Sequence, residues 1–169
     1  ALLLALNVGG WRVRLFSRSE VGPISSLAVL PFVNASGNDS IEYLGDGITE
    51  SLINTLSRIE RLRVIPTSTA FRYKGKTVDA EVVSRDLRVR AFVTGKVDQR
   101  GDRTIVQAEL IDATTGSQLW GERYDRPVAD LLNVEREITK DIVDSLQMRL
   151  TGEEMKAAAK RYTENEQAY

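Results

Sequence analysis

The chain has 169 residues, 42% of them hydrophobic and 28% charged, and its 23 basic and 24 acidic residues give a net charge of −1. This length accommodates one domain with a buried core, and the balanced charge opposes a nucleic-acid-binding surface, which needs clustered lysine and arginine. The sequence contains no histidine and no cysteine, which excludes disulfides, thiolate nucleophiles, imidazole bases and the common zinc and haem ligands.

The first residues, A-L-L-L-A-L, are apolar and are followed by Trp11 and three arginines. Six apolar residues are too few to cross a bilayer, which takes about 20. Residues 1–16 are nevertheless typical of the end of a transmembrane segment with its juxtamembrane stretch. Residues 17–24 contain Gly22 and Pro23 and are expected to form a linker. The arginines favour a cytoplasmic position for the remainder of the chain by the positive-inside rule.

Residues 26–32 form a short apolar run, S-L-A-V-L-P-F, which predicts a strand buried on both faces and ending at Pro31. Residues 41–59 are predicted to form the helix that packs on it. Its apolar residues recur at spacings of three and four, which places them in one stripe: Ile41, Leu44, Ile48, Leu52, Leu56 and Ile59. Gly45 falls within this stripe and Thr55 at its edge, so we expect the helix to approach the sheet closely.

The remaining elements follow from short apolar runs and helical spacing. Strands are predicted over 62–66, 90–98, 103–112 and 117–124, and helices over 77–87 and 128–150. Short turns at 99–102 and 113–116 make the last three strands antiparallel. The order is β-α-β-α-β-β-β-α. The predicted fold is therefore α/β (α+β), with one mixed five-stranded sheet and helices packed on it.

Two surface features are candidates for partner binding. The first is an acidic stripe on the helix 41–59, where carboxylates recur every four residues: Glu42, Asp46 and Glu50. The second is a basic and aromatic loop: Phe71, Arg72, Tyr73, Lys74 and Lys76. A solvated helix face and an exposed loop are the ordinary interpretations of such patterns. Both surfaces also suit contact with a protein partner or an unknown small ligand.

Gly75, Lys76 and Thr77 lie between a predicted strand and a predicted helix, as the end of a phosphate-binding P-loop does. A P-loop needs another glycine five residues earlier, and this chain has Ala70 there, followed by four bulky residues. Nucleotide binding or catalysis through this loop is therefore the weaker alternative. We expect no catalytic residue, no cofactor and no metal.

Several segments together resemble the TolB amino-terminal-like domain. They are L-A-V-L-P-F (27–32), Y-L-G-D-G-I-T-E-S-L-I-N-T-L-S (43–57), F-R-Y-K-G-K (71–76), A-F-V-T-G-K-V (91–97) and Q-A-E-L-I-D-A-T-T-G-S-Q-L-W-G-E-R-Y-D-R (107–126). The resemblance covers residues 25–150. It implies a fold like the class II synthetase anticodon-binding domain, shared with outer-membrane lipoproteins of the curli-secretion and penicillin-binding-protein-activator types. It transfers no reactive side chain.

Such domains occur in bacterial multidomain signalling proteins, beside adenylate cyclase, winged-helix or serine/threonine kinase modules. Residues 151–169 are expected to begin a helical region, and residues 156–169 resemble the lead-in to the first tetratricopeptide helix. The resemblance therefore implies a membrane kinase whose TolB-like domain lies outside the cytoplasm, in conflict with the arginine count. We expect a non-catalytic sensing or protein-interaction domain that is membrane-anchored. We expect it to be extracytoplasmic (periplasmic), with a cytoplasmic position as the alternative. A nucleic-acid-binding module, suggested by the fold, is a second alternative opposed by the neutral charge.

Overall fold

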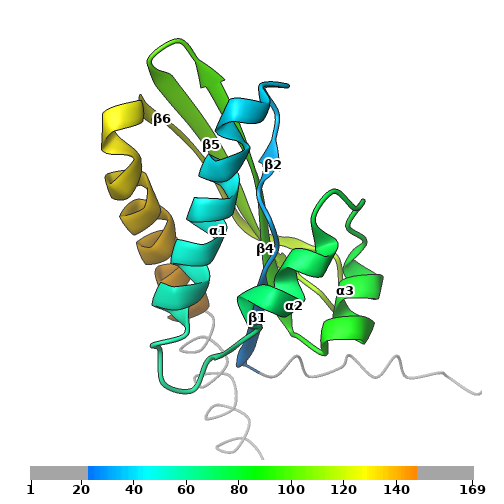
Figure 1. Ribbon diagram of the computed structural model, residues 1–169. Helices are drawn as coiled ribbons and strands as arrows, with labels where there is room; N and C mark the ends of the chain where they lie inside the picture. The colour runs from blue at the N-terminus through cyan, green and yellow to red at the C-terminus, as the bar shows by residue number, and fades with distance from the viewer. Residues whose placement is uncertain (1–22, 148–169) are drawn as a thin grey trace, which may run out of the picture.

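Within residues 23–147, which the computed structural model describes, one mixed sheet of six strands carries helices on both faces (Figure 1). The strands are β1 (Ser26–Val29), β2 (Val33–Asn34), β3 (Arg63–Val64), β4 (Ala91–Arg100), β5 (Arg103–Asp112) and β6 (Gln118–Pro127). The helices are α1 (Glu42–Leu56), α2 (Thr67–Ala70), α3 (Ala80–Leu87) and a helix over 131–147. Three 3-10 turns are η1 (Asp39–Ile41), η2 (Phe71–Tyr73) and η3 (Val128–Asp130).

The sheet combines parallel and antiparallel pairing. Its strand order is β3-β1-β4-β5-β6, in which β3, β1 and β4 are parallel and β4, β5 and β6 are antiparallel. The three long strands form the predicted meander, and Gly101 closes its first turn with a φ of 63°. The predicted α/β class and mixed sheet are therefore confirmed.

The strand count differs from the prediction, because five strands were expected and the described residues form six. The additional strand is β2, which pairs with β4 in parallel through Val33 opposite Lys96. Pro31 has no N–H to donate, so the first strand is interrupted after Val29 and resumes two residues beyond Pro31. A continuous apolar run in the sequence thus corresponds to two short strands beside the same partner.

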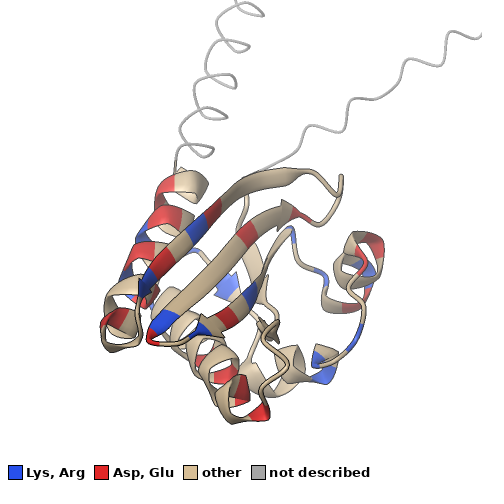
Figure 2. Ribbon diagram, turned by 90° about the horizontal axis from the view of Figure 1, so that it is seen from above, with Lys and Arg blue, Asp and Glu red and all other residues tan. Residues whose placement is uncertain are grey.

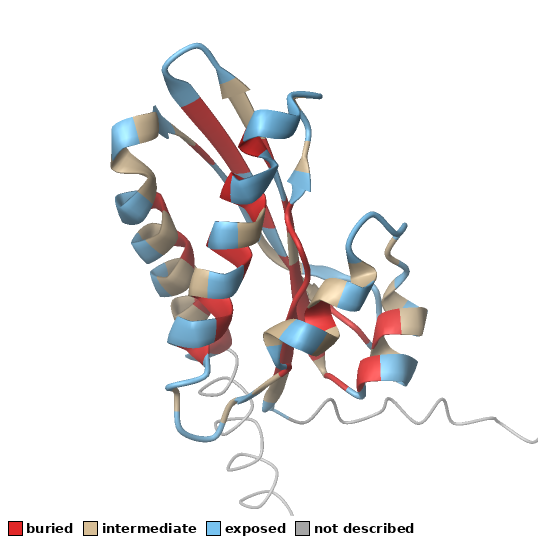
Figure 3. Cartoon of the chain, in the orientation of Figure 1, coloured by how far each residue is buried: buried red, intermediate tan, exposed pale blue. Residues whose placement is uncertain are grey.

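Alternating residues of the strands build two separate cores. One face of the sheet packs against α1 and the helix 131–147, and its largest fully buried side chains include Leu27, Leu52 and Ile138. The opposite face packs against α3 around Phe92 and Val83. Figure 3 shows the buried residues on the strands and on the inner sides of these helices. Helix α3 lies across the sheet from α1 (Figure 1), whereas the buried Ala70 of α2 packs in the same core as α1.

Phe32, between β1 and β2, is the point where α1 meets the sheet. Its N–H donates a hydrogen bond to Thr49 Oγ1 at 3.0 Å, and that hydroxyl donates to the carbonyl of Gly45 at 2.7 Å. A Cβ at Gly45 would lie 2.7 Å from the Phe32 carbonyl oxygen, and one at Gly95 would lie 2.5 Å from the Phe32 ring. Close packing at Gly45 is confirmed, whereas Thr55 is exposed and Thr49 is the buried threonine.

The other predicted helices begin later than expected. Helix α3 begins at Ala80 rather than Thr77, because the Asp79 side chain accepts hydrogen bonds from the N–H groups of Glu81 and Val82 and caps its first turn. Residues 128–130 form η3, so the last helix begins at 131. Tyr124 of β6 is buried and donates a hydrogen bond to Asp141 Oδ2 at 2.6 Å, which fastens this helix to the sheet.

Asp112 organises the turn between β5 and β6. Its carboxylate accepts hydrogen bonds from the N–H groups of Thr114 and Thr115. It also forms an ion pair with Arg90, whose Nη2 lies 2.9 Å from Asp112 Oδ2. Burial raises the pKa of this carboxyl, but the guanidinium and the two N–H groups outweigh burial and hold the pKa below its ordinary value. The carboxylate is therefore structural.

No helix in the described part of the chain combines the length and apolar character needed to cross a bilayer. The predicted end of a transmembrane segment (1–16), most of the predicted linker (17–24) and the predicted start of a helical region (151–169) lie outside residues 23–147. These three expectations therefore stay predictions.

Gly45→Ala should lower the free energy of unfolding by about 1–3 kcal/mol, because the new methyl group would overlap the Phe32 carbonyl. Gly47, two residues along the same helix, is the matched control because a Cβ there would meet nothing within 4 Å. Gly47→Ala should raise the free energy of unfolding by about 0.5–1 kcal/mol, as alanine favours the helix. Chemical denaturation measures both, and equal effects would contradict the close approach at Gly45.

Candidate functional site

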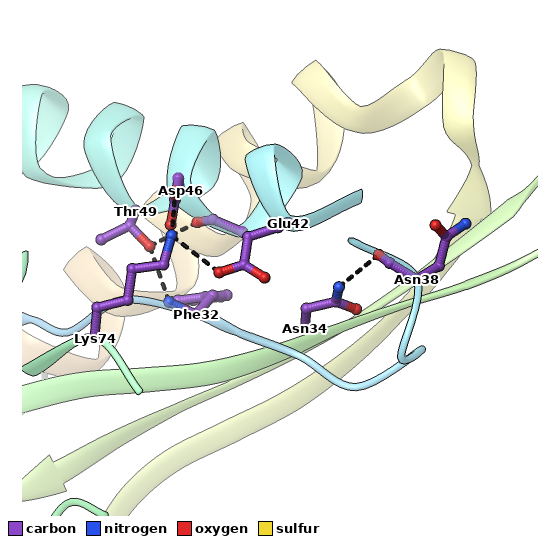
Figure 4. Close-up of polar contacts among 8 residues, drawn as sticks. Phe32, Asn34, Asn38, Glu42, Asp46, Thr49 and Lys74 are labelled. Carbon is purple, nitrogen blue, oxygen red and sulfur yellow. Dashed lines mark hydrogen bonds and ion pairs between the residues drawn. The ribbon is translucent and has the colours of Figure 1, made fainter. Parts of the chain in front are cut away.

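The two predicted surface features meet in the structure. Lys74, from the basic loop, places its Nζ 2.6 Å from Asp46 Oδ2 and 3.1 Å from Glu42 Oε1 on α1 (Figure 4). We refer to these three residues as the Lys74 bridge. The acidic stripe and the basic loop are therefore not two independent surfaces, since the central cation of one neutralises two carboxylates of the other.

Local structure explains how Lys74 reaches the helix. The chain leaves β3, forms the short helix α2 and then the 3-10 turn η2, which ends at Tyr73. Gly75 follows Lys74 with a φ of 72°, a conformation that glycine adopts without strain, and reverses the chain. Glu42 and Asp46 lie one turn apart on α1, where two carboxylates repel each other unless a cation lies between them.

The bridge is partly exposed to solvent. The exposed fractions of the side chains are 37% for Lys74, 48% for Glu42 and 28% for Asp46. The hydrogen bonds to Asp46 and, next, to Glu42 raise the pKa of Lys74 above its ordinary value. Ion pairs with this exposure contribute about 0–1 kcal/mol. The Lys74 bridge therefore positions the loop more than it stabilises the fold.

The other candidate residues divide into packed and free groups. Tyr73 packs on the core around Phe92, and its burial and then Asp86 raise the pKa of its hydroxyl. Phe71 is half-buried. Arg72 and Lys76 are exposed, and within residues 23–147 neither side chain forms an ion pair. The loop thus presents two free cations beside the bridge.

Helix α1 presents two further exposed side chains, Glu50 and Tyr43. Glu50, predicted with the acidic stripe, is exposed and has no ion pair among the described residues. Tyr43 is 68% exposed, and the sequence analysis did not select it. Its position outside the apolar stripe of α1 was the signal that this large aromatic would face solvent.

The geometry at Gly75, Lys76 and Thr77 differs from that of a P-loop. Thr77 precedes α3 by three residues rather than opening it. The N-terminal N–H groups of α3, which would bind a phosphate, are already bonded to the carboxylate of Asp79. Among residues 23–147, no group of three or more carboxylates could hold a metal ion.

Comparison with known proteins identifies relatives of this domain. The model of a family described as "HilA/YgeH-like transcriptional regulator, second domain" matches residues 24–145. A Rhizobium meliloti protein named "Putative adenylate cyclase 3" is 44% identical over 144 residues, which cover 85% of this chain and 24% of that protein. The chain therefore spans about a quarter of the length of this curated relative.

Two solved structures have a similar fold. Lipoprotein GNA1162 from Neisseria meningitidis aligns with a TM-score of 0.53 at 20% identity, covering 72% of this chain and 99% of that one. TolB from Acinetobacter baumannii aligns with a TM-score of 0.53 at 17% identity, covering 74% of this chain and 29% of TolB. At these identities the likeness concerns the fold alone, and it confirms the TolB-like fold that the motifs indicated.

Lys74→Met and Asp46→Asn should show a coupling energy of about 0.2–1 kcal/mol in a double-mutant cycle, and added salt should reduce it. Arg72→Met is the matched control, because this cation lies in the same loop without an ion pair, and its coupling to Asp46 should be near zero. Since the folded-state pKa of Lys74 is raised, the coupling is present below the ordinary value of 10.5 and is lost as pH rises through the higher folded value. Equal coupling for both cations would contradict a specific bridge.

Proposed function

The chain belongs to the family of the second domain of HilA/YgeH-like transcriptional regulators, and we propose that it is a non-catalytic interaction domain of a larger bacterial signalling protein. The observation that carries this proposal is that the domain is similar to parts of two different kinds of protein. One is named for a transcriptional regulator, and the other is a protein named for adenylate cyclase activity, of which the domain is about a quarter. A module shared by two such different effectors is best explained as a part that regulates them by binding.

The chemistry of the described residues supports a binding role. The chain lacks histidine and cysteine. Its best-buried carboxylate, Asp112, is bonded to Arg90 and to a turn, and Asp46 is bonded to Lys74. General acid–base catalysis needs a titratable group with its proton free to move to a substrate. These carboxylates serve the fold instead.

The loop beside the Lys74 bridge is the proposed partner-binding surface. Arg72 and Lys76 supply free charge, Phe71 supplies a half-buried aromatic, and the bridge holds the loop against α1. Arginine and aromatic side chains are enriched at protein–protein interfaces. We include Glu50, which is exposed on α1, in the proposed partner-binding surface. Lys74, Glu42 and Asp46 would then act by positioning the loop, and Tyr73 by anchoring it.

The cellular context is proposed from the sequence. Residues 1–16 suggest a membrane anchor, and residues 151–169 suggest the start of tetratricopeptide repeats. The resemblance to TolB-like domains suggests that the full-length protein also carries a serine/threonine kinase. We propose an extracytoplasmic position for the domain, with a cytoplasmic one as the alternative. The protein architecture implied by the resemblance to TolB-like domains supports the extracytoplasmic position. The names of the regulator family and of the Rhizobium meliloti relative favour the cytoplasmic alternative, since transcription and cyclic nucleotide synthesis take place there.

Nucleotides should not stabilise the chain. A ligand at 100 times its Kd adds about 2.7 kcal/mol, which shifts the melting temperature of a domain of this size by several degrees. Thermal scans with millimolar ATP, GTP or a cyclic nucleotide, each with and without magnesium, should therefore show no shift. A reproducible rise that Lys76→Ala abolishes would move the loop from partner surface to nucleotide site.

A photo-crosslinking amino acid at position 72 or 76 of the full-length protein should capture one discrete partner in cells, because these positions lie on the proposed surface. The same amino acid at position 115, in the exposed turn after β5, is the control and should not capture it. Mass spectrometry then identifies the partner and its compartment. Identical products at positions 72 and 115 would refute the loop as the binding surface, and a cytoplasmic partner would refute the extracytoplasmic placement.

A further inference from the structure

Within residues 23–147, α3 is the helix that packs on one face of the long β4–β5–β6 meander, and it leaves the part of this face around Lys96, Gln107 and Arg123 exposed. Strand pairing places its outward residues in rows across the three strands. One row is Lys96, Gln107 and Arg123, and the next is Asp98, Ile105 and Asp125. Figure 2 shows acidic and basic segments along these strands. We call the row of Lys96, Gln107 and Arg123 the cationic row.

The charges around the cationic row are paired, and those of the row itself are not. Arg100 forms an ion pair with Asp98 at 2.9 Å, and Arg103 forms one with Asp125 at 2.7 Å. Within residues 23–147, by contrast, neither Lys96 nor Arg123 forms an ion pair or a side-chain hydrogen bond, and both are exposed. The row therefore carries two uncompensated positive charges with the Gln107 amide between them.

The spacing of this row suits one carboxylate. Neighbouring strands lie about 4.8 Å apart, so Lys96 and Arg123, two strands apart, are separated by roughly 10 Å at the backbone. Their long side chains can both reach an anion above Gln107, whose amide N–H groups are further donors. Arginine also binds a carboxylate through two parallel N–H groups.

A hollow of about 170 Å³ lies at this row, bounded on one side by Ala35, after β2, and lined also by Ile105. Typical small-molecule pockets measure about 300–1,000 Å³, so the hollow is the size of a side-chain site rather than of a complete ligand pocket. Ile105, in the neighbouring row, is buried and provides an apolar floor. The hollow thus combines a place for a carboxylate with a place for an aliphatic group.

From this charge complementarity we propose that the open face of the meander docks an acidic segment of a protein partner, with a glutamate or aspartate carboxylate bound between Lys96 and Arg123 and an aliphatic neighbour against Ile105. This surface is separate from the loop of residues 71–76. The inference rests on the proposed interaction function but not on that loop.

The composition of the face favours an acidic peptide over nucleic acid. The neighbouring rows contain Asp98, Asp125 and Glu109, which would repel a continuous phosphate backbone. Nucleic-acid binding needs several phosphates to be neutralised by clustered cations. Two free cations suffice for one carboxylate. Glu109, one row away, has no ion pair in the described residues and is the single free carboxylate beside the site.

The test is an NMR titration of the isotope-labelled 169-residue chain with a capped hexapeptide of alternating glutamate and leucine. The side-chain amide signals of Gln107 and the backbone signals of Lys96 and Arg123 should shift and saturate. The double variant Lys96→Gln/Arg123→Gln should weaken binding by about tenfold or more, as each lost charge-assisted hydrogen bond is costly. Glu109→Gln should strengthen binding, because it removes the nearby negative charge.

Two controls separate a specific site from general charge attraction. Arg58→Gln/Arg136→Gln removes two exposed cations that form no ion pair within residues 23–147 and makes the same change in net charge, so it should leave binding unchanged. A hexapeptide with glutamine in place of glutamate should not bind. Equal loss in the two double variants, shifts confined to the loop, or preferred binding of a single-stranded DNA oligonucleotide would overturn the proposal. None of these results would alter the outcome of the nucleotide scans, which test the absence of nucleotide binding separately.

Discussion

The hydrogen bond from the N–H of Phe32 to Thr49 is the contact on which the arrangement of α1 and the sheet depends. Pro31 interrupts the first strand, and the next N–H donates to α1 instead of to a neighbouring strand. A buried N–H without a partner costs about 1–3 kcal/mol, so α1 cannot slide along the sheet without that loss. Gly45 and Gly95 allow this register, because a side chain on either would overlap Phe32.

This fixed position of α1 also determines where the acidic stripe lies. Glu42 and Asp46 are on the part of α1 that passes the β1–β2 connection, and Lys74, which follows the 3-10 turn η2, reaches both carboxylates (Figure 4). The loop proposed to bind a partner is thereby attached to α1. The bridge contributes about 0–1 kcal/mol, so it favours this position of the loop by no more than that amount and lowers the entropy lost on binding the proposed partner correspondingly.

The two proposed surfaces have a common physical basis. In both, some charges are neutralised within the domain and two cations form no ion pair among residues 23–147: Arg72 and Lys76 in the loop, Lys96 and Arg123 on the sheet. A surface of this kind is neutral overall, in keeping with the net charge of −1, and yet locally positive. Local complementarity of this kind contributes more to the choice of partner than to affinity.

The sequence by itself determined the class of the fold, the positions of most helices and strands and the close packing at Gly45, because these depend on apolar spacing and turn residues within short segments. It did not determine that Pro31 splits a strand, that Asp79 delays α3, or that Thr49 rather than Thr55 is buried. Only the tertiary structure brought Lys74 to Asp46, 28 residues away, and aligned Lys96 with Arg123. The physical reason is that local periodicity specifies which face of an element is buried, whereas strand register and the path of the connections decide which distant side chains meet.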